Sequence, residues 1–133
     1  MKKQLISQVL ESHLSELVSM SDQIYDFAEP GMEEIQSSRL LTEYLKAKGF
    51  EVECGIAGLP TAFRAVYEQG SGGPSFGFLA EYDAIKDIGH ACGHHIQGPS
   101  VIGAALALCD VCGEEPYKIV IYGTPAEETI GGK

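Results

Sequence analysis

The sequence predicts an α/β fold, a sheet with helices on both faces. The prediction depends on two nearly continuous apolar runs of strand length, residues 75–80 and 118–123, and on a helical pattern over residues 100–112 between them. Apolar runs of this kind are typical of interior strands that are covered on both sides. Strand, helix and strand in this order form the parallel crossover unit of α/β sheets.

The N-terminal half adds helices and further strands. Apolar residues recur every three or four positions over residues 4–27, which predicts a long amphipathic helix that covers the sheet. Pro30 and Gly31 end this helix, and a second helix is expected over residues 33–48, stopped by Gly49. Two short strands and a glycine-rich loop are expected before residue 75, at residues 50–54, 61–67 and 70–74.

Length and charge limit the classes of protein to which the chain can belong. Its 133 residues suit one domain of ordinary size, so we expect residues 1–133 to form a single domain. The formal charge is −10, from 19 acidic and 9 basic residues. Such a charge repels phosphate backbones and anionic lipid head groups, so nucleic acid and membrane surfaces are not expected partners.

Targeting signals are not recognised in the sequence. Polar residues interrupt the segment that follows the basic start Met1–Gln4, unlike the apolar core of a signal peptide. The longest apolar run, Val101–Leu108, is far shorter than the roughly 20 residues that cross a bilayer. The sequence therefore predicts a cytoplasmic protein, and its four cysteines are expected to be free thiols or metal ligands.

Metal-binding side chains follow the two apolar strands. Cys92 and His94 come after the first strand and are separated by one glycine, which allows a tight turn and lets both side chains face one ion. Glu127 and Glu128 come directly after the second strand. Open α/β sheets bind ligands beyond the carboxyl ends of their strands, so the two sets are expected to meet there.

The residue types indicate metal-assisted hydrolysis. Thiolate, imidazole and carboxylate together suit Zn²⁺ or another borderline divalent ion. Such an ion activates water and polarises a scissile carbonyl. Of two adjacent glutamates, one binds the metal and the other acts as general base and then protonates the leaving amine. These groups predict a metal-dependent enzyme that hydrolyses amide bonds.

Three segments resemble a known family. They are Phe78–Ala84, Ile88–His94 and Gly123–Thr129, and Gly131 and Gly132 follow the last of them. These motifs are similar to the amidohydrolase branch of the aminoacylase and carboxypeptidase clan of two-metal peptidases, most of all to its aminobenzoyl-glutamate and dipeptide hydrolase group. The resemblance covers the whole chain and implies the first part of a co-catalytic zinc exopeptidase-like catalytic domain, without the lid domain and the remaining strands.

The resemblance also implies roles for individual residues. Cys92 would bridge two metal ions, and His94 and Glu128 would be further ligands. Glu127 would be the general base, and Asp83 would orient a ligand. The cofactors implied for the full-length enzyme are two divalent ions, zinc or manganese before cobalt or nickel. The implied substrate is a small N-acyl amino acid, an aminobenzoyl-glutamate-like conjugate or a dipeptide.

The chain departs from the family pattern near the site. His95 stands where relatives have Asp or Asn, and Ile85–Lys86 stands where they have Leu–Pro. Both changes alter the rim of the site and bear on substrate preference. Glu81 occupies the place where more distant relatives carry a metal-binding histidine, and its role stays open, as do those of His90 and His95.

These residues also fit other interpretations. With three candidate ligands for two ions, the isolated chain is expected to have little activity. The alternative function is a non-catalytic remnant or subunit that binds metal or a partner, such as a second copy, through an unfinished sheet. Cys109 and Cys112 form a CxxC that suits a redox module or, with Cys92 and His94, a structural zinc site. Glu33–Glu34 is interpreted as first-turn charge that stabilises a helix start.

Overall fold

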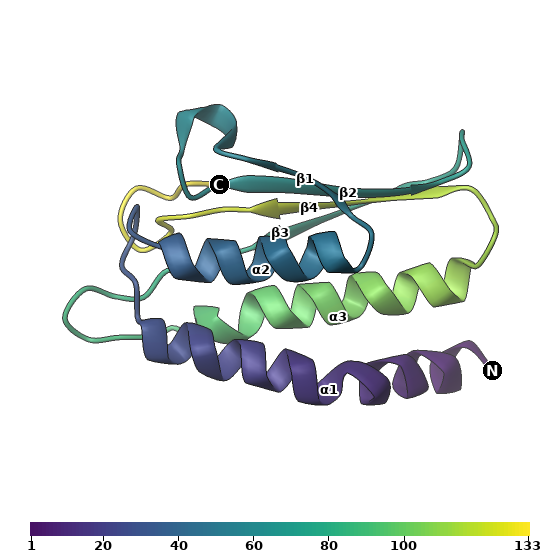
Figure 1. Ribbon diagram of the computed structural model, residues 1–133, viewed down its shortest axis with the longest axis horizontal. Helices are drawn as coiled ribbons and strands as arrows, with labels where there is room; N and C mark the ends of the chain where they lie inside the picture. The colour runs from purple at the N-terminus through teal and green to yellow at the C-terminus, as the bar shows by residue number, and fades with distance from the viewer.

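The computed structural model describes residues 1–133, and it has three α-helices beside a four-stranded sheet (Figure 1). The α/β class predicted from the sequence is confirmed. The elements in chain order are α1 (Lys2–Phe27), α2 (Ile35–Ala47), β1 (Glu51–Cys54), a 3-10 turn (Ile56–Gly58), β2 (Phe63–Gln69), β3 (Ser75–Ala80), α3 (His94–Cys112) and β4 (Tyr117–Gly123).

The sheet is mixed, with strand order β1-β2-β4-β3. β4 pairs in parallel with β3 and antiparallel with β2, and β1 completes the sheet beside β2 in antiparallel pairing. The parallel crossover β3-α3-β4 is therefore the unit that the sequence predicted. Its register pairs Ala80 with Gly123, so both strands end at the same edge. The loops that carry the candidate metal-binding motifs leave the sheet at that edge.

The helices lie on one side of the sheet within residues 1–133 (Figure 1). α2 and α3 lie next to the strands, and α1 packs against α3. Side chains on the helix side, such as Ile119 and Ile121, are fully buried, whereas Leu79 and Tyr122 are exposed. The sequence predicts helices on both faces of the sheet, but the structure has them on one face only. Strand residues that point to the other face contact no helix.

The main difference from the sequence-based prediction is the start of α3. A helix was expected from residue 100, but it begins at His94, directly after Gly93, which has a φ of 85°. Pro99 lies inside the helix, which continues through it. The local pattern Gly98–Pro99 is typical of a loop, and tertiary packing overrides it here because both residues are buried. His94 therefore has a helical backbone that holds it at the sheet edge.

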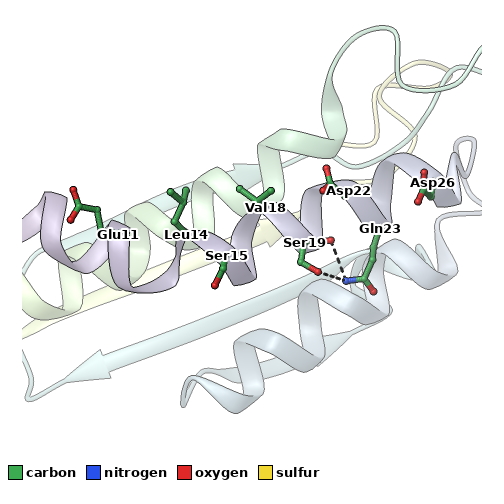
Figure 2. A pocket seen from close by; sticks show the side chains of 8 residues that line it. All are labelled: Glu11, Leu14, Ser15, Val18, Ser19, Asp22, Gln23 and Asp26. Carbon is green, nitrogen blue, oxygen red and sulfur yellow. Dashed lines mark hydrogen bonds between the residues drawn. The ribbon is translucent and has the colours of Figure 1, made fainter.

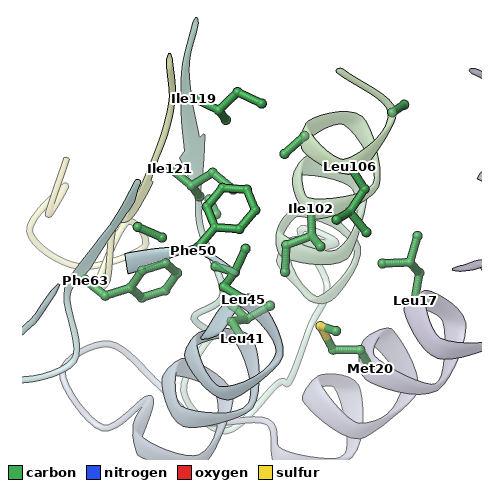
Figure 3. Packing of buried hydrophobic residues seen from close by; sticks show 14 of the residues in the cluster. Leu17, Met20, Leu41, Leu45, Phe50, Phe63, Ile102, Leu106, Ile119 and Ile121 are labelled. Atoms are coloured by element: carbon green, nitrogen blue, oxygen red, sulfur yellow. The ribbon is translucent and has the colours of Figure 1, made fainter. Parts of the chain in front are cut away.

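The core lies between the sheet and the α2–α3 layer (Figure 3). Leu41 and Leu45 of α2 and Ile102 of α3 face the strands' Ile119 and Ile121, and all are almost completely buried. Each such side chain contributes about 1.5–3 kcal/mol by leaving water. α3 is long and apolar enough to cross a bilayer by those two criteria alone, and its position between α1 and the sheet accounts for its composition.

The outer surface of α1 carries a shallow, open depression (Figure 2). Its lining comes from this single helix and is mostly polar, with Leu14 and Val18 as its apolar side chains. The depression contains no histidine or cysteine, unlike the sheet edge at which the candidate metal-binding motifs leave the strands. The candidate functional site therefore lies at that edge.

Candidate metal centre

The candidate site begins where β3 and β4 end. The backbone nitrogen and hydroxyl of Thr124 both donate to the carbonyl of Ala80, at 2.8 and 3.2 Å. This pair fixes the two loops, residues 81–93 and 124–133, at one edge of the sheet. The first residue of α3, His94, lies between the loops.

His94 is buried, and both of its ring nitrogens face acceptors. Nδ1 lies 3.0 Å from the Asp83 carbonyl oxygen and 3.1 Å from Asp83 Oδ1, while Nε2 lies 3.1 Å from Glu81 Oε2. A neutral imidazole has only one N–H. One of the two contacts therefore requires a second proton on the ring or a cation between nitrogen and carboxylate. With its proton on the Asp83 side, His94 presents Nε2 as a ligand.

Two further carboxylates approach the same ring. Glu127 Oε2 lies 3.7 Å from Nε2, and Glu128 Oε1 lies 3.8 Å from Nδ1. One ligand atom each from Glu81, His94 and Glu127 lies within 4.8 Å of the other two, a spacing that suits one metal ion. Glu128 Oε1 is buried and has no hydrogen-bond partner. Buried carboxylate oxygens without a donor are costly, so this atom also fits a bound cation.

The site carries a concentrated negative charge. Four carboxylates, from Glu81, Asp83, Glu127 and Glu128, surround one imidazole at 3.1 to 3.8 Å. Lys133 gives partial compensation, because its Nζ lies 2.7 Å from Glu81 Oε1. Burial acts to raise the pKa of Glu81, but the Lys133 ammonium group, together with Gln97 and His94, outweighs it and the pKa is lowered. The donor types and the repulsion between the carboxylates fit divalent metal.

Cys92 is exposed and adjoins Glu128. A hydrogen bond with the Glu128 carboxylate raises the pKa of the Cys92 thiol, and partial desolvation and the nearby acidic groups add to this effect. A bound cation would instead lower the pKa of this thiol, because only the thiolate is a metal ligand. The thiol therefore faces the acidic loops and not the apolar core.

Asp83 joins the two halves of the site. It is 1% exposed, and its Oδ2 accepts a hydrogen bond of 2.9 Å from the Glu128 backbone nitrogen, while Oδ1 faces His94. The structure thus brings together all five residues singled out from the sequence, Asp83, Cys92, His94, Glu127 and Glu128, and adds Glu81. Which of them bind metal and which transfers the proton stays a prediction.

Glu34 was misinterpreted from the sequence. It is completely buried and makes no hydrogen bond that caps α2. Its Oε1 accepts from the Ala126 backbone nitrogen at 2.7 Å, and its Oε2 accepts from the Thr61 hydroxyl at 2.9 Å. Glu29 is the residue that stabilises the start of α2, because its carboxylate accepts from the backbone nitrogens of Gln36 and Ser37 at 2.8 and 2.9 Å.

The structure separates Cys109 and Cys112 from this site. Cys109 lies 15 residues along α3 from His94, which is about 22 Å at 1.5 Å per residue. A structural zinc site shared by these cysteines, Cys92 and His94 is therefore excluded. Burial raises the pKa of the Cys109 thiol, which disfavours the thiolate that a redox module needs.

His90 and His95 form a separate group with Tyr25 of α1. The two imidazole centroids lie 5.2 Å apart, and Tyr25 lies 6.3 Å from His90 and 5.1 Å from His95. Burial, followed by the nearby His95, lowers the pKa of His90. Through these contacts, the loop of residues 81–93 and the start of α3 pack against α1.

An α/β sheet with acidic, histidine and cysteine side chains at its carboxyl edge is typical of metal-dependent hydrolases. No family model matches the chain, but known proteins do. Mouse Xaa-Arg dipeptidase is 33% identical over 143 residues, covering 98% of this chain and 33% of the relative. A p-aminobenzoyl-glutamate hydrolase of Escherichia coli, through one of its subunits, is 29% identical over 147 residues, covering 96% of this chain and 30% of the relative.

A solved structure supports the same relationship at the level of fold. A dinuclear metal-binding peptidase of the M20 family from Bacillus subtilis superposes with a TM-score of 0.74 at 23% identity, over 89% of this chain and 36% of that one. The chain is similar in sequence to these hydrolase relatives and shares its fold with part of an M20-family peptidase. It spans about a third of the length of the curated relatives named above.

Proposed function

We propose that residues 1–133 provide the metal-binding edge of a metal-dependent amidohydrolase. The observation that carries the proposal is the His94 imidazole, which has acceptors at both ring nitrogens and four carboxylates around it. The proposed substrates are small N-acyl amino acids, aminobenzoyl-glutamate-like conjugates and dipeptides. The names of the dipeptidase and aminobenzoyl-glutamate hydrolase relatives support this substrate class.

The donors fall into two groups, which supports a proposal of two divalent ions. His94 Nε2 and Glu81 form one group, with Glu127 beside them as the proposed base, and Cys92 and Glu128 form the other. Zinc or manganese is proposed first, because a thiolate and an imidazole favour borderline ions, and both zinc and manganese accept carboxylate ligands. When bound, such ions lower the pKa of water and polarise the scissile carbonyl.

The protein's own groups then have distinct tasks. The Glu127 side chain is 32% exposed, against 9% for Glu81, so it is the carboxylate better able to reach a substrate. It accepts the proton of the attacking water and delivers it to the leaving amine. Asp83 orients His94 through Nδ1 and holds the Glu128 backbone, so both ligands keep their direction when substrate enters.

The first test is metal binding by residues 1–133. Titration calorimetry with Zn²⁺ and with Mn²⁺ is expected to show binding that His94→Ala weakens at least tenfold. The matched control is His13→Ala, since His13 lies on α1 and pairs with Glu16 at 3.5 Å, away from the site. Equal binding by both variants, or no binding by the unaltered chain, would contradict the proposal.

The second test is turnover. Hydrolysis of N-acetyl amino acids, p-aminobenzoyl-glutamate and Xaa-Arg dipeptides is measured with metal present, both for residues 1–133 and for the protein extended to the length of its relatives. The extended protein is expected to be active and to lose activity with Glu127→Gln, while residues 1–133 show little turnover. Metal-free dimerisation without turnover in either form would favour the non-catalytic alternative.

A further inference from the structure

The segment between α1 and α2, residues 28–34, supports both loops of the site. The Ala84 nitrogen donates to the Glu29 carbonyl at 2.8 Å, next to the bridge between Pro30 and Ala84. A Cβ on Gly31 would lie 2.8 Å from Thr129 Oγ1 and 3.0 Å from the Ala126 Cα, so the segment also touches the second loop without a gap. A part of the chain that carries no metal ligand therefore contacts both ligand-bearing loops.

Glu34 reaches from this segment to the backbone that precedes Glu127 and Glu128. Its two oxygens each accept one hydrogen bond, from the Ala126 nitrogen and from the Thr61 hydroxyl. Burying a carboxylate is unfavourable unless such donors compensate. Helix capping does not explain the residue, because the start of α2 is bonded by Glu29. The contact with Ala126 is thus the specific interaction that Glu34 makes.

Ala126 has a backbone that requires support. Its φ is 58°, in the left-handed region that residues with a Cβ adopt rarely. Its carbonyl accepts from the nitrogens of Ile130 and Gly131, both at 3.0 Å, which closes a tight turn. Glu127 and Glu128 lie inside this turn, so the conformation of Ala126 sets the direction in which their side chains leave the backbone.

Two buried carboxylates hold the turn from opposite sides. Glu34 binds the backbone nitrogen before Glu127, and Asp83 binds the backbone nitrogen after it. We propose that Glu34 is a positioning residue that fixes the Ala126 backbone and thereby aims Glu127 and Glu128 at His94. The inference rests on the proposed metal centre, but it concerns a residue that touches neither metal nor substrate.

The experiment compares Glu34→Asp with Glu34→Gln. Aspartate keeps the charge but is one methylene shorter, so it cannot keep the 2.7 Å contact with Ala126. Glutamine keeps the length and an oxygen acceptor but loses the charge. Zn²⁺ affinity is expected to fall at least tenfold in Glu34→Asp and to stay within about threefold of the unaltered chain in Glu34→Gln. Loss of affinity in glutamine but not in aspartate would overturn the proposal in favour of a charge effect.

Glu29→Gln is the matched control. It alters a buried carboxylate in the same segment that bonds α2 and not the site. We expect this variant to lower the melting temperature and to leave Zn²⁺ affinity unchanged. An equal loss of affinity in Glu29→Gln would reduce Glu34 to a general stabiliser of the fold and overturn its positioning role.

Hydrogen exchange at the Ala126 amide separates this inference from the proposed function. If the unaltered chain binds no metal, the proposed function fails, and the exchange rate alone decides the positioning role. Glu34→Asp is expected to expose this amide while core amides of β4 remain protected, and unchanged protection would overturn the inference. If Glu34→Asp does not fold, Thr61→Val is tested in its place. This variant is expected to lose about threefold in Zn²⁺ affinity and to exchange the Ala126 amide faster. No change in either quantity would overturn the inference.

Discussion

Replacing Asp83 with asparagine should damage both halves of the site. Asp83 offers one oxygen to His94 Nδ1 at 3.1 Å and the other to the Glu128 nitrogen at 2.9 Å. Asparagine has only one oxygen, so its amide group must face one of these partners. If the amide nitrogen faces Glu128, two hydrogen-bond donors oppose each other. If it faces His94, it favours the tautomer in which Nε2 carries the proton and cannot bind metal.

The magnitude follows from these two orientations. A buried donor left without an acceptor costs about 1–3 kcal/mol, and loss of one of four crowded carboxylates offsets part of this in the metal-free protein. Loss of an orienting partner lowers metal affinity by about 10–100-fold, equivalent to roughly 1.4–2.7 kcal/mol. The metal-loaded protein should therefore lose more stability than the metal-free protein, because the stabilisation by a bound ligand grows with the logarithm of its affinity.

Urea denaturation with and without Zn²⁺, together with calorimetric titration, measures both quantities. Asp110→Asn is the control, because Asp110 is an exposed carboxylate near the far end of α3. It should leave metal affinity unchanged and alter the free energy of unfolding by less than about 0.5 kcal/mol. An Asp83→Asn variant with unaltered metal affinity would refute the orienting role of Asp83.

Three further predictions test the fold and the ligands. Gly123→Ala should lower the free energy of unfolding by about 1–3 kcal/mol in urea, because the added Cβ would overlap a ring carbon of Phe63; unchanged stability would contradict this packing. Burial raises the pKa of Glu34 above 4.5, so its contribution to stability is present at low pH and is lost as pH rises. The stability of Glu34→Gln relative to the unaltered chain should thus increase with pH above 4.5 in thermal melts, and a decrease would show the opposite shift. In alkylation followed by mass spectrometry, Zn²⁺ should protect Cys92 but not the exposed Cys54, and equal rates would argue against a thiolate ligand.

The sequence was most informative where local pattern and tertiary structure agree. The apolar runs of β3 and β4 and the helical spacing between them predict the crossover, and a crossover places both strand ends at one edge. The convergence of Cys92, His94 and Glu128 could therefore be anticipated from their positions after these strands. The boundaries of the other helices and strands differ from the predicted ones by no more than two residues at each end.

Features that depend on distant residues were not predictable in this way. Glu34 and Ala126 are 92 positions apart, and no local periodicity indicates that one bonds the other. The start of α3 at His94 depends on the burial of Gly98 and Pro99, which local turn preference contradicts. The face of the sheet that the helices cover also depends on how α2 packs, since an amphipathic pattern shows that a face is buried but not on which side of the sheet.

X-ray absorption at the zinc edge of the Zn²⁺-loaded protein would measure the ligand set itself. If Cys92 and His94 bind the ion with the glutamates, the spectrum should contain a zinc–sulfur shell at about 2.3 Å and a nitrogen or oxygen shell at about 2.0–2.2 Å. Cys92→Ser should remove the sulfur shell and retain the other. A spectrum without sulfur and without the multiple scattering of an imidazole would show that these side chains do not meet at a metal.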